Sequence, residues 1–131
     1  MNFKNVLIAS VAGAVVMMLL GYIVYVMLLG DVMTSSVSKD PDMGLVFAGH
    51  LFGSGLLAYI YNRWANISTF STGAVAGLVI GILVELYFVL IMMGTTTMFT
   101  TNAAVTDIIA TGVIFAIAGG VIGIVLGKLS S

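Results

Sequence analysis

The chain has 131 residues, of which 61% are hydrophobic and only 7% are charged, and its mean hydropathy is +1.24. A soluble domain carries about a quarter charged residues, which cover its surface. Four basic and five acidic side chains therefore exclude a soluble globular, a disordered or a nucleic-acid-binding protein. Without cysteine the chain forms no disulfide or thiolate site, and a net charge of −1 attracts no polyanion. The composition predicts an integral membrane protein.

Four apolar segments are long enough to cross a bilayer, which takes about 20 helical residues. We expect an all-α fold, a four-helix transmembrane bundle in one domain, with helices over about 5–29, 43–61, 72–93 and 103–126. Barrel strands would alternate apolar and polar residues, whereas these segments are continuously apolar, so helices are the structure that satisfies the backbone in lipid. The first segment exceeds the roughly 7–15 apolar residues of a cleavable signal peptide.

The basic residues predict the orientation of the bundle. Three short loops would join the helices, at 30–42, 62–71 and 94–102. Four spans place both termini and the second loop on one side, with Lys4, Arg63 and Lys128, and leave only Lys39 on the other. The positive-inside rule then puts both termini in the cytoplasm. We expect a multi-pass protein of the inner (plasma) membrane.

Glycines recur every four residues in the apolar segments, which predicts close helix packing because positions four apart share a helix face. The third segment has Gly73, Gly77 and Gly81, the fourth has Gly119, Gly123 and Gly127, and the second has Gly49 and Gly53. The two longer runs, which are glycine zippers by their spacing, lie at matching depth. We therefore expect the third and fourth helices to pack on each other, with a contact between copies as the alternative.

Three ionisable residues lie inside the predicted spans, where their cost in lipid makes them functional candidates. At about 1.5 Å per residue, His50 and Glu85 lie roughly 10 and 12 Å from the same end of the bundle, and Asp107 about 6 Å. Glu85 continues the face of Gly81, and Asp107 and Thr111 continue that of Gly119. We therefore expect an outward-facing polar pocket, with Tyr25 as a further candidate member. Its residues are Glu85, His50, Asp107, Tyr22 and Thr111.

Each of these residues also has a purely structural interpretation. His50 would be a hydrogen-bonded packing residue, and Glu85 a neutral carboxyl that joins helices. Asp107 would cap the fourth helix. One imidazole and two carboxylates would also suit Zn, Mn or Fe, but histidine ligands usually occur in groups, so we expect no metal and no other cofactor.

Two resemblances to known proteins follow from short segments. The stretch STFST at 68–72 resembles the broken third helix of the small fluoride channels, but the glycine pair followed by arginine of that family is missing, and Gly49 and His50 stand near its pore asparagine. We do not adopt that family. The stretches 56–77, 91–99 and 119–128 resemble uncharacterised small four-helix membrane proteins of bacteria. Such proteins often carry acidic residues where Glu85 and Asp107 stand, and the resemblance implies the fold without an activity.

Three functions from different classes are consistent with these observations. The first is a membrane protein whose polar pocket binds or conducts a proton, a small cation or a small polar solute. The second is an accessory subunit of a larger membrane complex. The third is a lipid-binding protein or an intramembrane enzyme with His50 and Glu85 as base and acid, although we expect no enzymatic activity. The expected partners are membrane lipid and either further copies or other membrane subunits, and no nucleic acid.

Overall fold

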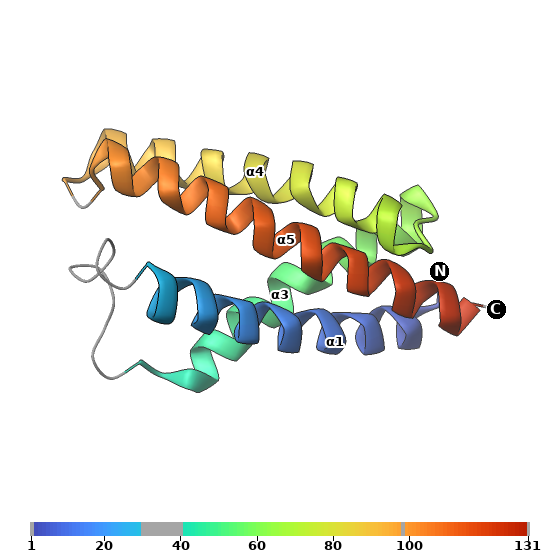
Figure 1. Ribbon diagram of the computed structural model, residues 1–131. Helices are drawn as coiled ribbons and strands as arrows, with labels where there is room; N and C mark the ends of the chain where they lie inside the picture. The colour runs from blue at the N-terminus through green and yellow to red at the C-terminus, as the bar shows by residue number, and fades with distance from the viewer. Residues whose placement is uncertain (1, 30–40, 98, 131) are drawn as a thin grey trace.

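A computed structural model of the chain describes residues 2–29, 41–97 and 99–130, and these residues form an all-α protein (Figure 1). Asp31, Lys39 and Asp40 of the first loop lie outside them. In chain order the elements are α1 (Phe3–Gly21), η1 (Tyr22–Leu28), α3 (Met43–Ile60), η2 (Tyr61–Ala65), α4 (Phe70–Thr95) and α5 (Thr101–Ser130). The π-helical segments η1 and η2 continue α1 and α3, so four packed helices are each long and apolar enough to cross a membrane. The chain is a multi-pass membrane protein.

Each of the four helices begins beside a short polar side chain, because the first backbone N–H groups of a helix have no partner within it. Asn2 accepts from Lys4 N, Asp42 from Leu45 N, Thr69 from Thr72 N and Thr100 from Ala103 N, at 3.1 to 3.3 Å. The helix starts are therefore determined locally, by single residues that the sequence displays.

The helix ends differ from the sequence prediction. The second helix was expected to end at 61, but η2 carries it to Ala65, so the second loop is shorter than 62–71. It stops at Asn66, whose φ of 51° lies in the left-handed region that short amide side chains tolerate at helix ends. The fourth helix runs to Ser130 instead of 126. Polar residues can prolong a helix beyond the lipid, where hydropathy no longer indicates it.

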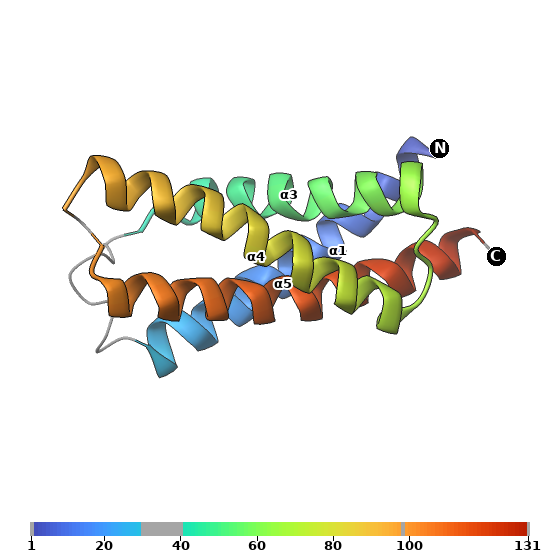
Figure 2. The same ribbon diagram turned by 90° about the horizontal axis from the view of Figure 1, so that it is seen from above.

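The helices form two antiparallel pairs, which meet where α5 of one pair packs along α1 of the other (Figures 1 and 2). One pair is α4 with α5, the other is α1 with α3, and α5 also packs along α1, whereas α3 and α4 scarcely touch each other. The hydroxyl of Ser54 on α3 donates to the carbonyl of Ser10 on α1 inside the second pair. Both termini lie at one end of the bundle, together with the connection between α3 and α4.

Glycines bring the backbones of α4 and α5 together. A Cβ at Gly77 would overlap the carbonyl oxygen of Phe115, and one at Gly73 would overlap that of Gly119. Gly81 leaves room for the Phe115 side chain: a Cβ added at Gly81 would lie 2.5 Å from the Cβ of Phe115. The two glycine runs therefore face one another at Gly73, Gly77 and Gly119, as their spacing and matching depth predict.

The remaining glycines have other neighbours. Gly123 and Gly127 lie under the carbonyls of Thr69 and Ser68, so α5 is crossed there by the connection that precedes α4 rather than by α4 itself. Gly53 is in ordinary contact with Met17 and Phe115, whereas Gly49 is exposed and a Cβ there would meet nothing within 4 Å. The expectation that Gly49 takes part in close helix packing within the bundle is wrong.

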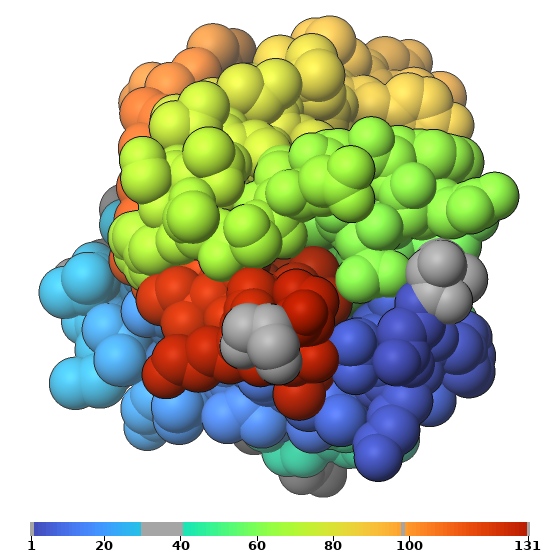
Figure 3. Space-filling view, turned by 90° about the vertical axis from the view of Figure 1, so that its right-hand side faces the viewer, coloured from blue at the N-terminus to red at the C-terminus, as the bar shows by residue number. Residues whose placement is uncertain are grey.

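Tyr61 closes the end of the bundle that carries the termini. Its fully buried side chain reaches from η2 to α4, where the hydroxyl donates to the Gly73 carbonyl at 2.6 Å. The Tyr61 hydroxyl oxygen would also lie 2.6 Å from a Cβ at Gly119. Figure 3 views this end, where the last turns of α5 lie between the start of α1 and the α3–α4 connection. One phenol thus joins α3 to the α4–α5 pair.

Replacing Tyr61 by phenylalanine tests this junction. Tyr61→Phe keeps the buried ring and removes one hydrogen bond, so we expect the free energy of unfolding in detergent micelles to fall by about 1 kcal/mol. Tyr59→Phe removes the same group from a more exposed ring and is expected to change stability by less than about 0.5 kcal/mol. Denaturation by SDS, followed by circular dichroism, measures both. Equal stability of the two variants would contradict the role given to the Tyr61 hydroxyl.

Candidate functional site

A cluster of polar side chains from three helices lies inside the bundle, toward the end opposite the termini. Tyr25 of η1 donates from its hydroxyl to Asp107 Oδ1 on α5 at 2.5 Å, and the same hydroxyl lies 3.3 Å from Thr111 Oγ1. Glu85 of α4 interacts with the side chains of both Asp107 and Thr111. These four residues, which we call the carboxyl cluster, connect the two helix pairs.

Asp107 is the most buried member of the cluster, with 8% of its surface exposed. The structural interpretation, in which Asp107 caps the fourth helix, is wrong, because α5 begins at Thr101 and the hydroxyl of Thr100 accepts from Ala103 N. Asp107 therefore lies six residues, about 9 Å, inside the helix. Its carboxyl faces other helices and is bound by a phenol instead of by backbone N–H groups.

Glu85 reaches the cluster because α4 lies so close to α5. It follows Gly81 by one helical turn on the same face, and Gly81 accommodates Phe115 of α5. Phe115 in turn is one turn beyond Thr111. The shared face that the sequence predicts for Glu85, Asp107 and Thr111 is the one at which α4 and α5 meet.

The π-helical segment η1 decides which tyrosine joins the cluster. Tyr25 is half-buried against α5, whereas Tyr22, which we expected in the pocket, is 60% exposed. A π-helix closes its hydrogen bonds over five residues instead of four, so residues three apart diverge further around its axis than in an α-helix. The turn that directs Tyr25 inward consequently leaves Tyr22 outside. Hydropathy gives no sign of this change, because both segments are uniformly apolar.

His50 is not part of the cluster. Its imidazole lies against Gly21 on α1: a Cβ added at Gly21 would be 3.8 Å from Nε2 of His50. Equal depth along the bundle does not bring His50 and Glu85 together, because their helices, α3 and α4, scarcely touch. The structure thus separates the two residues that would have to act jointly as base and acid in an intramembrane enzyme.

The charges of the described residues are unevenly distributed along the bundle. Lys4, Arg63 and Lys128 all lie at the end with the termini, whereas the carboxyl cluster lies toward the other end. Tyr25 and Thr111 offer the cluster hydroxyl groups and no positive charge. Two adjacent carboxyls repel one another when both are ionised, so a proton or a cation is needed to compensate them.

Comparison with known proteins does not identify a family for this chain. No protein-family model matches the sequence, and no curated protein or solved structure is significantly similar to it. The function must therefore be inferred from the carboxyl cluster itself.

Proposed function

We propose that this protein binds or conducts a proton or a small monovalent cation at the carboxyl cluster. The observation that supports the proposal is the position of Glu85 beside Asp107, whose carboxyl accepts from Tyr25, inside a membrane bundle whose described basic residues all lie elsewhere. Carboxyls in a membrane span are costly unless they are paired or serve an ion pathway. In this proposal the pair carries one negative charge, and the second site is occupied by a proton or by a cation.

The proposed ion path is outward-facing. Lys4, Arg63 and Lys128 gather at the end with the termini, which by the positive-inside rule lies in the cytoplasm of a bacterial inner membrane. The carboxyl cluster then lies toward the outer face, and the close contacts at Gly73, Gly77 and Tyr61 close the inner half. We propose that a second copy or another membrane subunit completes the path across the membrane.

Glu85→Gln tests the proposal, because glutamine keeps the shape and hydrogen bonding of the side chain but cannot titrate. We expect the wild-type protein in liposomes to carry a flux of protons or alkali cations, and we expect this flux to fall about tenfold or more in Glu85→Gln. A tenfold change corresponds to about 1.4 kcal/mol, which is the size of one hydrogen bond to a charged group. Asp42→Asn is the matched control. It also removes one carboxylate, but outside the span, and asparagine caps a helix as well as aspartate does.

The same experiment separates the second candidate function, an accessory subunit of a larger complex. That candidate is favoured by the way the cluster joins η1, α4 and α5, since hydrogen bonds between helices hold bundles together in lipid. It predicts no flux above that of empty liposomes for the wild-type protein and the same helix assembly in Glu85→Gln. It also predicts a stoichiometric foreign partner in native mass spectra of the gently extracted protein.

A further inference from the structure

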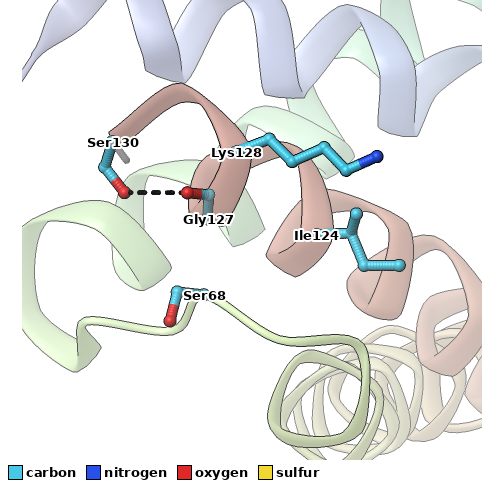
Figure 4. A pocket seen from close by; sticks show the side chains of 5 residues that line it. All are labelled: Ser68, Ile124, Gly127, Lys128 and Ser130. Atoms are coloured by element: carbon cyan, nitrogen blue, oxygen red, sulfur yellow. Dashed lines mark hydrogen bonds between the residues drawn. The ribbon is translucent and has the colours of Figure 1, made fainter.

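Two adjoining hollows lie at the end with the termini, apart from the carboxyl cluster. The inner hollow, of about 230 Å³, lies between η2 and the end of α5 and is lined by Tyr61, Asn62, Ser68 and Ser130, among others. The outer hollow, of about 420 Å³, shares Ser68 and Ser130 and adds Lys128. In Figure 4, Ser68 lies on the connection across from the last turns of α5, and Lys128 extends from α5 on the side of Ile124, away from Ser68.

The inner hollow has unused hydrogen-bond acceptors. Asn62 Oδ1 is buried and has no hydrogen-bond partner within the described part of the chain, which is costly for an amide oxygen. The Ser130 hydroxyl donates its hydrogen to the Leu126 carbonyl at 2.8 Å, and the Tyr61 hydroxyl donates to Gly73. The hydrogens of both hydroxyls are therefore committed to backbone carbonyls. A hydrogen-bond donor in this hollow would supply the partner that Asn62 Oδ1 lacks.

The position of the hollows along the helices places them among lipid headgroups. Thirty residues of α5 span about 45 Å, against about 30 Å for the hydrocarbon core, so the last turns of α5 extend into the interfacial layer. Trp64 is 69% exposed at the same end and meets Tyr59 edge to face at 5.3 Å. Exposed tryptophan and tyrosine are typical of the headgroup level.

We propose that the two hollows bind the headgroup of an aminophospholipid, with its primary ammonium at Asn62 in the inner hollow and its phosphate beside Lys128 and Ser68 in the outer one. The inner volume exceeds the roughly 30 Å³ share of one water molecule several times, which leaves room for an ethanolammonium group. The lining agrees with this zwitterion: Asn62, with its partnerless oxygen, lines the inner hollow, and the cationic Lys128 lines only the outer one. The inference stands independently of the function proposed for Glu85.

The test is lipid selectivity of the full chain. The purified protein is mixed with phosphatidylethanolamine, phosphatidylcholine and phosphatidylglycerol of identical acyl chains, and bound lipid is counted by native mass spectrometry. We expect a preference of about tenfold for phosphatidylethanolamine, the scale of one hydrogen bond from a charged donor. The trimethylammonium of phosphatidylcholine has no N–H to donate, and phosphatidylglycerol has no ammonium at all.

Variants of Asn62 assign the preference to the inner hollow. Asn62→Leu is expected to remove the preference, and Asn62→Asp, which keeps the shape and adds a negative charge, is expected to increase it. Asn102→Leu, which removes an amide at the opposite end of the bundle, should leave the preference unchanged. Thermal unfolding without lipid confirms that each variant is folded, and Asn62→Asp remains informative if Asn62→Leu is not.

Three kinds of outcome would overturn the proposal. The first is equal binding of the three lipids by the wild-type protein, or an unchanged preference in both Asn62 variants. The second is a preference for phosphatidylglycerol that depends on Lys128, which would indicate an anion site without an ammonium pocket. The third is equal stabilisation by soluble phosphoethanolamine at the concentration at which the lipid saturates, which would indicate a site for a free amine rather than for a lipid.

Discussion

Gly77→Leu is expected to lower the free energy of unfolding by about 3 kcal/mol or more, the largest effect of any single substitution considered for this chain. Even a Cβ at Gly77 would overlap the Phe115 carbonyl oxygen, which is backbone of α5 and has no rotamer by which to move away. The whole helix must shift, and the contacts at Gly73 and Gly81 shift with it. The loss exceeds the gain of up to about 1 kcal/mol in helix propensity on replacing glycine.

Gly49→Leu is the matched control for this effect. A Cβ at Gly49 meets nothing within 4 Å and the position is exposed, so the substitution gains helix propensity without steric cost. We expect its stability to equal or exceed that of the wild type. SDS titration followed by circular dichroism and by the fluorescence of Trp64, the single tryptophan, measures both variants. If Gly77→Leu proves as stable as Gly49→Leu, that result contradicts the close packing of α4 against α5 at Gly77.

Tyr25→Phe is expected to lower the free energy of unfolding by about 1–2 kcal/mol, because it removes the only hydroxyl hydrogen that the structure directs to Asp107 Oδ1 within the described residues. A hydrogen bond to a carboxylate is stronger than one between neutral groups, and lipid offers the carboxylate no replacement donor. A cycle with Asp107→Asn isolates the pair. We expect a coupling of about 1 kcal/mol between the two substitutions.

Tyr22→Phe is the control, since it removes the same hydroxyl from the same π-helical segment at a 60% exposed position. We expect a change within about 0.5 kcal/mol and no coupling with Asp107→Asn. The comparison is sharp because the sequence ranks Tyr22 as the pocket residue and the structure selects Tyr25. Equal effects of the two phenylalanine substitutions would contradict the position of Tyr25 in the carboxyl cluster.

The carboxyl cluster and the headgroup site lie at opposite ends of one bundle, and α5 contributes to both. Asp107 and Thr111 belong to its first turns, and Lys128 and Ser130 to its last. Between them, Gly119 and Phe115 hold α4 close. Because the two sites share no residue, Glu85→Gln should leave the lipid preference unchanged and Asn62→Leu should leave ion flux unchanged.

The sequence by itself determined the class of the protein, the four spans, the common end of the two termini and the face shared by Glu85, Asp107 and Thr111. These properties depend on apolar length, on capping residues and on the spacing of residues along one helix, all of which are local. The helix starts, predicted from hydropathy at about 5, 43, 72 and 103, lie at Phe3, Met43, Phe70 and Thr101, where local caps fix them.

Only the tertiary structure decided which helices touch and which side chains meet between them. In a soluble helix the apolar face indicates the core, but here every face is apolar, so nothing in the sequence shows that α3 and α4 stay apart and that His50 lies against Gly21 instead of Glu85. The π-helical turn that selects Tyr25 over Tyr22 is likewise absent from the hydrophobic pattern. The partnerless oxygen of Asn62 arises only where η2, the connection before α4 and the end of α5 come together.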